Sequence, residues 1–162
     1  MKHFRNLCAL AFLAAALVAT STITSAQQNR DRDYRQLRGT WSTQVQLVDC
    51  SSGNPIGSPF RSLLTFAQGG TMTETTANPN FYPAERGPGH GVWNGHDDGY
   101  SAASTALITL NGVLQSTQVI RQAITMNDGP DSFGSVATVQ FFDPNGNLLK
   151  SGCATATGIR FK

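Results

Sequence analysis

The stretch Leu37-Arg-Gly-Thr-Trp-Ser-Thr-Gln-Val-Gln-Leu-Val-Asp-Cys50 shows how the folded part of the chain begins. From Trp41 to Leu47, side chains suited to a core alternate with polar ones: Trp41, Thr43, Val45 and Leu47 against Ser42, Gln44 and Gln46. A period of two puts one face against a core and the other in water, as in an antiparallel sheet. We therefore predict a strand near residues 39–49 that is buried on one face.

The rest of the chain repeats this pattern and offers no clear helix. Gly, Asn and Pro clusters such as Asn111-Gly112 and Asp143-Pro-Asn-Gly146 mark tight turns between the runs. We predict strands near 39–49, 60–68, 71–76, 90–94, 100–110, 113–126, 133–142 and 148–161. The long irregular stretch 77–89, with three prolines, is either a functional flap or a poorly ordered loop.

Eight or nine short strands in sequence order suit an open sandwich or a closed barrel. Closure removes the exposed edges of the sheet, so we predict an all-β fold, a single antiparallel up-and-down barrel of about eight strands. An interior of that size holds side chains or one small ligand.

The first residues are typical of a targeting segment. Lys2 and Arg5 precede an apolar run over residues 7–19, and Thr24-Ser25-Ala26 ends in small residues. This order predicts a signal peptide over 1–26, and the run is shorter than the roughly 20 residues that span a bilayer. We expect a lead-in over 27–38, a barrel domain over 39–162, a secreted or periplasmic location, and no stable membrane anchor.

The charge of the chain gives no sign of a polyanionic partner. Lys2 and Arg5 leave with the signal peptide, so ten of the 12 basic residues remain to balance ten acidic ones. A net charge near zero argues against nucleic acid or an anionic membrane as partner. Nothing in the sequence indicates an oligomeric state.

Only two cysteines follow the predicted cleavage site, Cys50 and Cys153. An oxidising compartment favours a disulfide between them, and two buried free thiols are the alternative. The bond would join the start of the barrel domain to its end.

The two ends of the domain resemble the calycin group, which comprises lipocalins, fatty-acid-binding proteins and avidins. The resemblance is carried by Gly39-Thr-Trp41 on the first strand and Arg160 on the last. It implies that Trp41 closes one end of a lipocalin-like barrel and that Arg160 packs over its ring. The chain lacks the lipocalin Thr-Asp-Tyr turn and the tryptophan-rich site of avidins, so no specific ligand is implied.

The inferred contact and the inferred disulfide agree with each other. In an antiparallel pair of strands, the residue numbers of facing residues add to a constant. The sum for Trp41 and Arg160 differs by only two from the sum for Cys50 and Cys153. Both pairs therefore place the first strand beside the last in nearly the same register. The two pairs lie on opposite faces of the sheet.

The expected function is binding of a small, mostly apolar molecule inside the barrel. Large apolar side chains that would face one way form the predicted walls: Phe66, Met72, Trp93, Ile108 and Phe141. Each of them also suits a barrel that is simply packed solid. Two other functions stay open, a cyclase or isomerase that works by shape, and an interaction or inhibitor module with a filled barrel.

Catalytic and metal signatures are weak. Within strand-like runs, the ionisable side chains that would serve an enzyme are Glu74, His90 and Arg121, and the outer surface is the commoner place for such groups. His90, His96, Asp97 and Asp98 match no metal-ligand spacing, so we expect no metal and no other cofactor.

Overall fold

In a computed structural model, residues 36–162 form nine strands and one short 3-10 helix. The strands are β1 (Gly39–Val48), β2 (Pro55–Phe66), β3 (Thr71–Thr76), β4 (Glu85–Arg86), β5 (Gly89–His96), β6 (Gly99–Leu110), β7 (Val113–Met126), β8 (Ser132–Phe142) and β9 (Leu148–Arg160). The helix, η1 (Pro79–Phe81), precedes β4. The predicted signal peptide, and the lead-in as far as residue 35, lie outside the described residues.

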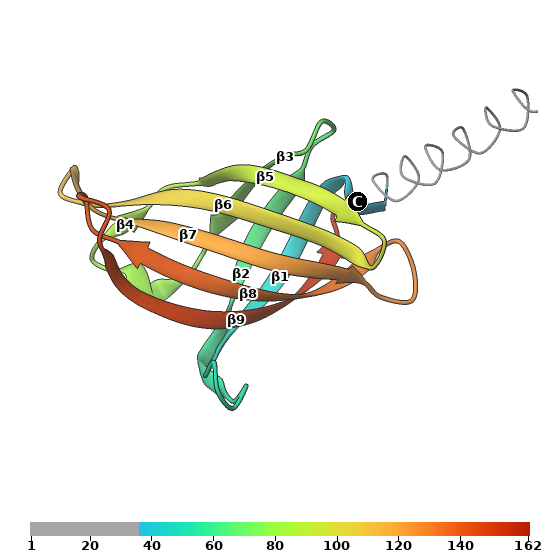
Figure 1. Ribbon diagram of the computed structural model, residues 1–162, viewed down its shortest axis with the longest axis horizontal. Coiled ribbons are helices and arrows are strands. Elements are labelled where there is room, and N and C mark those ends of the chain that lie inside the picture. The colour runs from blue at the N-terminus through green and yellow to red at the C-terminus, as the bar shows by residue number, and fades with distance from the viewer. Residues whose placement is uncertain (1–35) are drawn as a thin grey trace, which may run out of the picture. The chain divides into compact units, whose positions relative to one another are not determined.

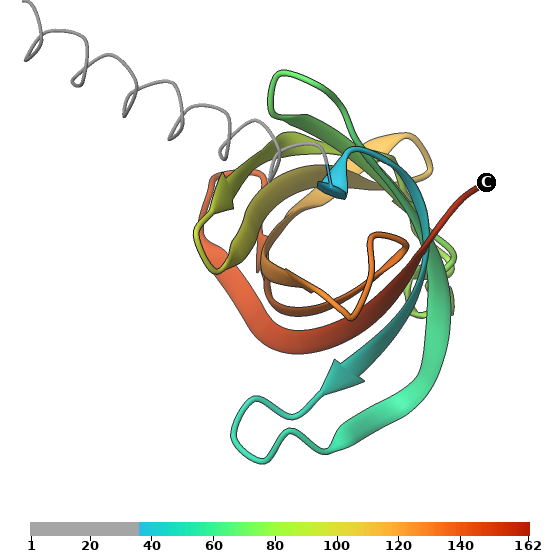
Figure 2. The same cartoon turned by 90° about the vertical axis from the view of Figure 1, so that its right-hand side faces the viewer.

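The strands make one closed antiparallel barrel (Figure 1). The sheet order is β4-β6-β5-β3-β2-β1-β9-β8-β7, and a further pairing of β6 with β7 closes the ring. β4 contributes only two residues, so eight longer strands form the wall. Figure 2 shows the closed ring in a view along the barrel. The predicted all-β, up-and-down barrel is confirmed.

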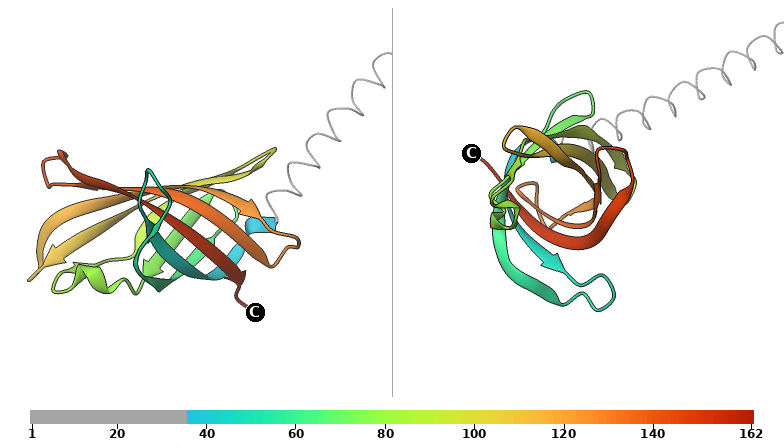
Figure 3. Two further views of the ribbon diagram at one scale, coloured as in Figure 1. Left: turned by 90° about the horizontal axis from the view of Figure 1, so that it is seen from below. Right: turned by 90° about the vertical axis from the view of Figure 1, so that its left-hand side faces the viewer.

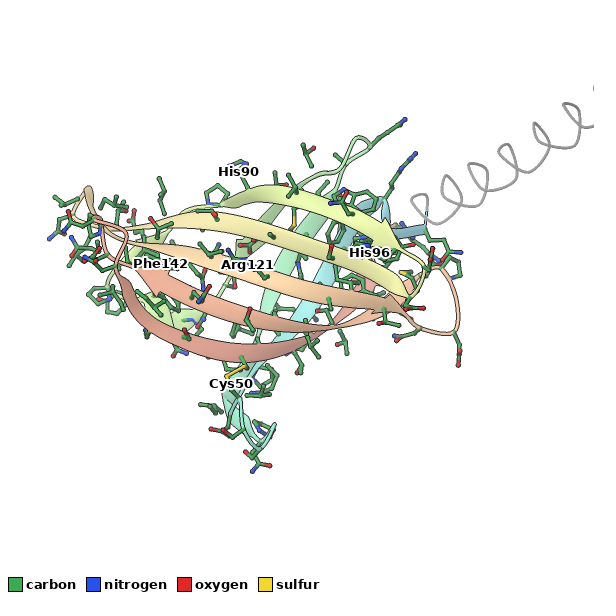
Figure 4. All side chains as sticks on the ribbon, viewed as in Figure 1. Cys50, His90, His96, Arg121 and Phe142 are labelled. Carbon is green, nitrogen blue, oxygen red and sulfur yellow. A yellow bond between two sulfur atoms is a disulfide. The ribbon has the colours of Figure 1, made fainter. Side chains whose placement is uncertain are left out.

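The seam between β1 and β9 has the predicted register. Trp41 faces Arg160 across the ladder, and Val48 faces Cys153. Cys50 lies just beyond the end of β1 and forms a disulfide with Cys153, with 5.2 Å between the Cα atoms (Figure 4). The two ends of the described chain are therefore joined both by a β-ladder and by a covalent bond.

Aromatic rings fill one end of the barrel. Trp41 and Phe133 pack edge to face at 5.0 Å between ring centroids, and Phe66 contacts both Phe133 and Trp93 in the same manner. All four side chains are fully buried. Edge-to-face packing contributes about 0.5–1.5 kcal/mol per pair beyond the burial of area, so this closed end is a packed core.

Arg160 closes that end from outside the core. Its guanidinium carbon lies 4.2 Å from the centroid of the Trp41 ring, which is the contact implied by the calycin resemblance. Gly39 allows it: its φ is +122°, and a Cβ there would lie 2.9 Å from Nη1 of Arg160. The first residue of the Gly-x-Trp motif is thus glycine for both conformational and steric reasons.

Leu37, just before β1, packs against the closed end of the barrel. Leu37, within the predicted lead-in, is fully buried, and its carbonyl accepts a 2.8 Å hydrogen bond from Nε1 of Trp41. Among residues 36–162, no helix is long and apolar enough to cross a membrane.

Candidate functional site

A cavity of about 830 Å³ lies in the half of the barrel away from the aromatic core and extends to exposed residues at its rim such as Ile56 and Leu149. Phe133 and Leu64 are among the residues that line it, and its walls include residues of β1, β2, β3, β4, β6, β7, β8 and β9. A cavity of this size falls within the range of about 300–1,000 Å³ that accommodates small-molecule ligands. It is therefore the candidate functional site.

The five predicted wall residues divide between the two halves. Ile108 and Phe141 line the cavity. Phe66, Met72 and Trp93 are buried but are not among the residues that line it. Alternation along a strand specifies the face of a residue but not its depth along the barrel axis, so sequence alone did not separate the two groups.

Glu74 points into the cavity from β3. The burial pattern of this strand alternates, with Met72 and Glu74 buried between exposed neighbours. Its ladder partners are Leu64 and Gly89, and a Cβ on Gly89 would lie 2.3 Å from Oε1 of Glu74. The absence of a side chain at residue 89 makes the space that the carboxylate occupies.

Arg86 forms an ion pair with Glu74 inside the barrel. Nη2 donates to Oε1 of Glu74, Nε donates to Oε1 of Gln118 at 2.5 Å, and Nη1 donates to the Gly87 carbonyl at 3.1 Å. Only 3% of the Arg86 side chain and 6% of the Glu74 side chain are exposed. In a buried pair of this kind, loss of one partner leaves an uncompensated charge and typically costs about 3–5 kcal/mol.

A one-residue irregularity before β5 turns Arg86 inward. Arg86 pairs with Ile108, and His90 pairs with Thr105, so four residue steps on one side face three on β6. The extra residue inverts the alternation, as a β-bulge does. Arg86 therefore shares the inner face with Ile108, while His90 is exposed on the outer face of β5 (Figure 4).

The segment between β3 and β5 also covers part of the opening of the cavity. Phe81 of η1 lies 5.9 Å from the guanidinium carbon of Arg86 and 6.4 Å from the Phe141 ring centroid. In Figure 3 this green segment lies at the barrel end that also carries the β6–β7 and β8–β9 turns. The stretch predicted as a flap or a poorly ordered loop thus supplies Phe81 and Arg86 to the site.

The other two weak catalytic candidates lie outside the cavity. Arg121 is exposed on β7 and donates a 2.9 Å hydrogen bond to Gln140, and His90 is exposed on β5. His96 bonds the Ser101 hydroxyl at 2.8 Å. No group of three or more potential ligands suited to a metal ion occurs among residues 36–162.

Two buried polar residues of the cavity were not predicted from the sequence. Gln118 and Ser104 are buried, line the cavity, and lie on β7 and β6. Both occupy inward positions of strands that were predicted correctly, so an alternation count that included polar residues would have found them.

Comparison with protein-family models finds no match, and a search of curated proteins finds no significant relative. The barrel itself, with eight long antiparallel strands closed by β6 and β7, is consistent with a lipocalin-like fold.

Proposed function

We propose that this protein is an exported, lipocalin-like barrel that binds a small, mostly apolar molecule in its cavity. One observation carries the proposal: aromatic rings pack one end of the barrel closed, and the other end opens into a cavity of about 830 Å³. A barrel that served only as a scaffold gains stability from a filled interior, because a cavity forfeits packing contacts.

The composition of the wall supports an apolar ligand. Val45, Leu47, Ile108, Ile120 and Phe141 face the space, and the charged Arg86 and Glu74 pair with each other. Burial of apolar ligand area against such walls contributes roughly 25 cal/mol per Å² before the costs of association.

Export and kinship with calycins belong to the same proposal. The disulfide between Cys50 and Cys153 supports an oxidising compartment, since such bonds persist in secreted and periplasmic proteins. The Trp41–Arg160 contact behind Gly39 supports kinship with the calycin group. The mass and N-terminal sequence of protein recovered from the periplasm of an expressing host test cleavage after Ala26.

Native mass spectrometry of that periplasmic protein tests binding. We expect a co-purified lipid or pigment, or saturable uptake of an uncharged, environment-sensitive apolar dye that such a molecule displaces. Protein that carries no small molecule and takes up no dye would contradict the proposal.

A barrel enzyme of the cyclase or isomerase type is the second candidate. The buried Glu74–Arg86 pair favours it, because ionisable groups in a cavity are the usual means of proton transfer. Recovery of a bound ligand chemically unchanged after prolonged incubation favours binding; recovery of an isomer favours the enzyme.

A further inference from the structure

The polar groups of the cavity restrict which ligand it accepts. In an arginine side chain, Nε and Nη2 form one edge that can donate parallel hydrogen bonds to both oxygens of one carboxylate. In Arg86, Gln118 occupies the first of these donors and Glu74 the second. A ligand carboxylate therefore finds this edge already taken.

Because Glu74 and Gln118 bind the same edge of Arg86, the Glu74 carboxylate lies beside the Gln118 amide. Gln118 presents its oxygen to Arg86, so its Nε2 donors point elsewhere. Within residues 36–162, neither Nε2 of Gln118 nor Oε2 of Glu74 has a hydrogen-bond partner, although both side chains line the cavity. Among the side chains of residues 36–162, Arg38 alone has a polar atom that is both sealed from solvent and without a hydrogen-bond partner. Nε2 of Gln118 and Oε2 of Glu74 are therefore not sealed, and they open onto the cavity that their side chains line.

We propose that the cavity recognises an uncharged, mostly apolar molecule whose polar end both donates and accepts a hydrogen bond. Nε2 of Gln118 donates to the ligand's oxygen, and Oε2 of Glu74 accepts from its N–H or O–H. Primary amides and hydroxy-ketones have this character. The inference rests on the proposed binding function and names the ligand class for it.

The charges of the site disfavour an anion. Glu74 neutralises Arg86, so a ligand carboxylate at this pair would lose its hydration and lie beside another carboxylate. The remaining charged residue of the lining, Lys150, is exposed on β9 with its Nζ 4.5 Å from the Phe141 ring centroid. Lys150 is thus solvent-exposed, whereas the Glu74–Arg86 pair is buried.

Dodecanamide and dodecanoate test the inference, because they share one apolar chain and differ at the head group mainly in charge. Each is titrated at neutral pH against the purified, exported protein, with displacement of an uncharged apolar dye as the readout. We expect the amide to bind about tenfold tighter or more, which is a difference of about 1.4 kcal/mol.

Glu74→Gln tests the assigned residue. The variant keeps an oxygen for Arg86 but leaves its charge unopposed, so the preference for the amide should shrink or reverse in favour of dodecanoate. Glu85→Gln is the matched control, because Glu85 is exposed on β4 next to Arg86, and there the preference should be unchanged. Lys150→Met shows whether any dodecanoate binds with its head at Lys150.

The outcomes separate the two proposals. Dodecanoate binding as tightly as the amide to the unaltered protein, with or without dependence on Lys150, overturns this inference and leaves the binding function standing. If the dye binds but neither dodecanamide nor dodecanoate displaces it, the inference is also overturned and the binding function stands. If the dye, dodecanamide and dodecanoate all fail to bind, the binding function itself is overturned. An unchanged preference in folded Glu74→Gln overturns the role of Glu74, and if that variant does not fold, the unaltered protein decides.

Discussion

The guanidinium of Arg160 lies over the ring of Trp41 and binds both the residues just before β1 and the β7–β8 turn. Its Nη1 donates to the Arg38 carbonyl at 2.6 Å, and its Nη2 donates to the carbonyls of Gln36 and Pro130. A 3.0 Å ion pair joins Nε to Asp131. One side chain therefore joins the start of β1, the β7–β8 turn and the aromatic core.

Removal of the ring beneath Arg160 should be costly. Trp41→Ala opens a large cavity in the closed end and leaves the Leu37 carbonyl without its donor. We expect a loss of about 3–5 kcal/mol in the free energy of unfolding, measured by urea titration. Gln44→Ala, at an exposed position of the same strand, is the control. A loss below about 1 kcal/mol would show that Trp41 is not a buried cap.

The disulfide should stabilise the seam independently of that contact. The bond closes a loop with a sequence separation of 103 residues. Its loss, through Cys50→Ala with Cys153→Ala, should lower the free energy of unfolding by about 2–5 kcal/mol. Thiol titration of the unreduced protein checks the bond directly, and two reactive thiols per chain would contradict it.

The inner and outer faces of β6 offer a matched test of the cavity. Ile108 lines it, whereas Leu107 is 55% exposed. Ile108→Trp should weaken uptake of an apolar dye about tenfold, which corresponds to 1.4 kcal/mol, because the new ring occupies ligand space. Leu107→Trp should leave uptake unchanged. Equal effects of the two substitutions would place the bound dye outside the barrel.

Ile108 faces the cavity and Leu107 faces outward, as a period of two predicts for neighbouring residues of a strand. The alternation predicted the strands, because it depends on local spacing. The Trp41–Arg160 contact, implied by the calycin resemblance, and the Cys50–Cys153 disulfide, expected in an oxidising compartment, predicted the β1–β9 register. The alternation made no prediction for Arg86, which lies in the stretch 77–89 that showed no alternation, and there a one-residue irregularity places the side chain on the inner face. It also gave no measure of depth, so Phe66 and Trp93 were expected beside Ile108 in one wall. Depth depends on strand tilt and stagger, which arise only when the sheet closes.

Acid should weaken the closed end through Asp131. A hydrogen bond from Lys162, with the charge of Lys162 and the contact with Arg160, holds the pKa of the Asp131 carboxyl below its ordinary value. A carboxyl with a lowered folded-state pKa contributes stability that is full above its unfolded pKa, roughly 3.9, and is lost as pH falls through the folded value. Unfolding free energies of the protein and of Asp131→Asn should therefore converge as pH falls below about 4. A difference independent of pH would contradict this linkage.

The space above Gly89 should control the position of Glu74. In Gly89→Ala the added methyl would lie 2.3 Å from Oε1 and 2.9 Å from Cδ of Glu74, so the carboxylate must leave its place. We expect overpacking to cost about 1–3 kcal/mol of unfolding free energy. Because Arg86 then loses its partner, the preference for dodecanamide over dodecanoate should fall, as in Glu74→Gln. Gly134→Ala is the control, since a Cβ there meets only Oδ1 of Asn127, at 3.8 Å. If Gly89→Ala prefers dodecanamide over dodecanoate as strongly as the unaltered protein does, the prediction is contradicted. The Glu74–Arg86 ion pair would then form without the space at residue 89.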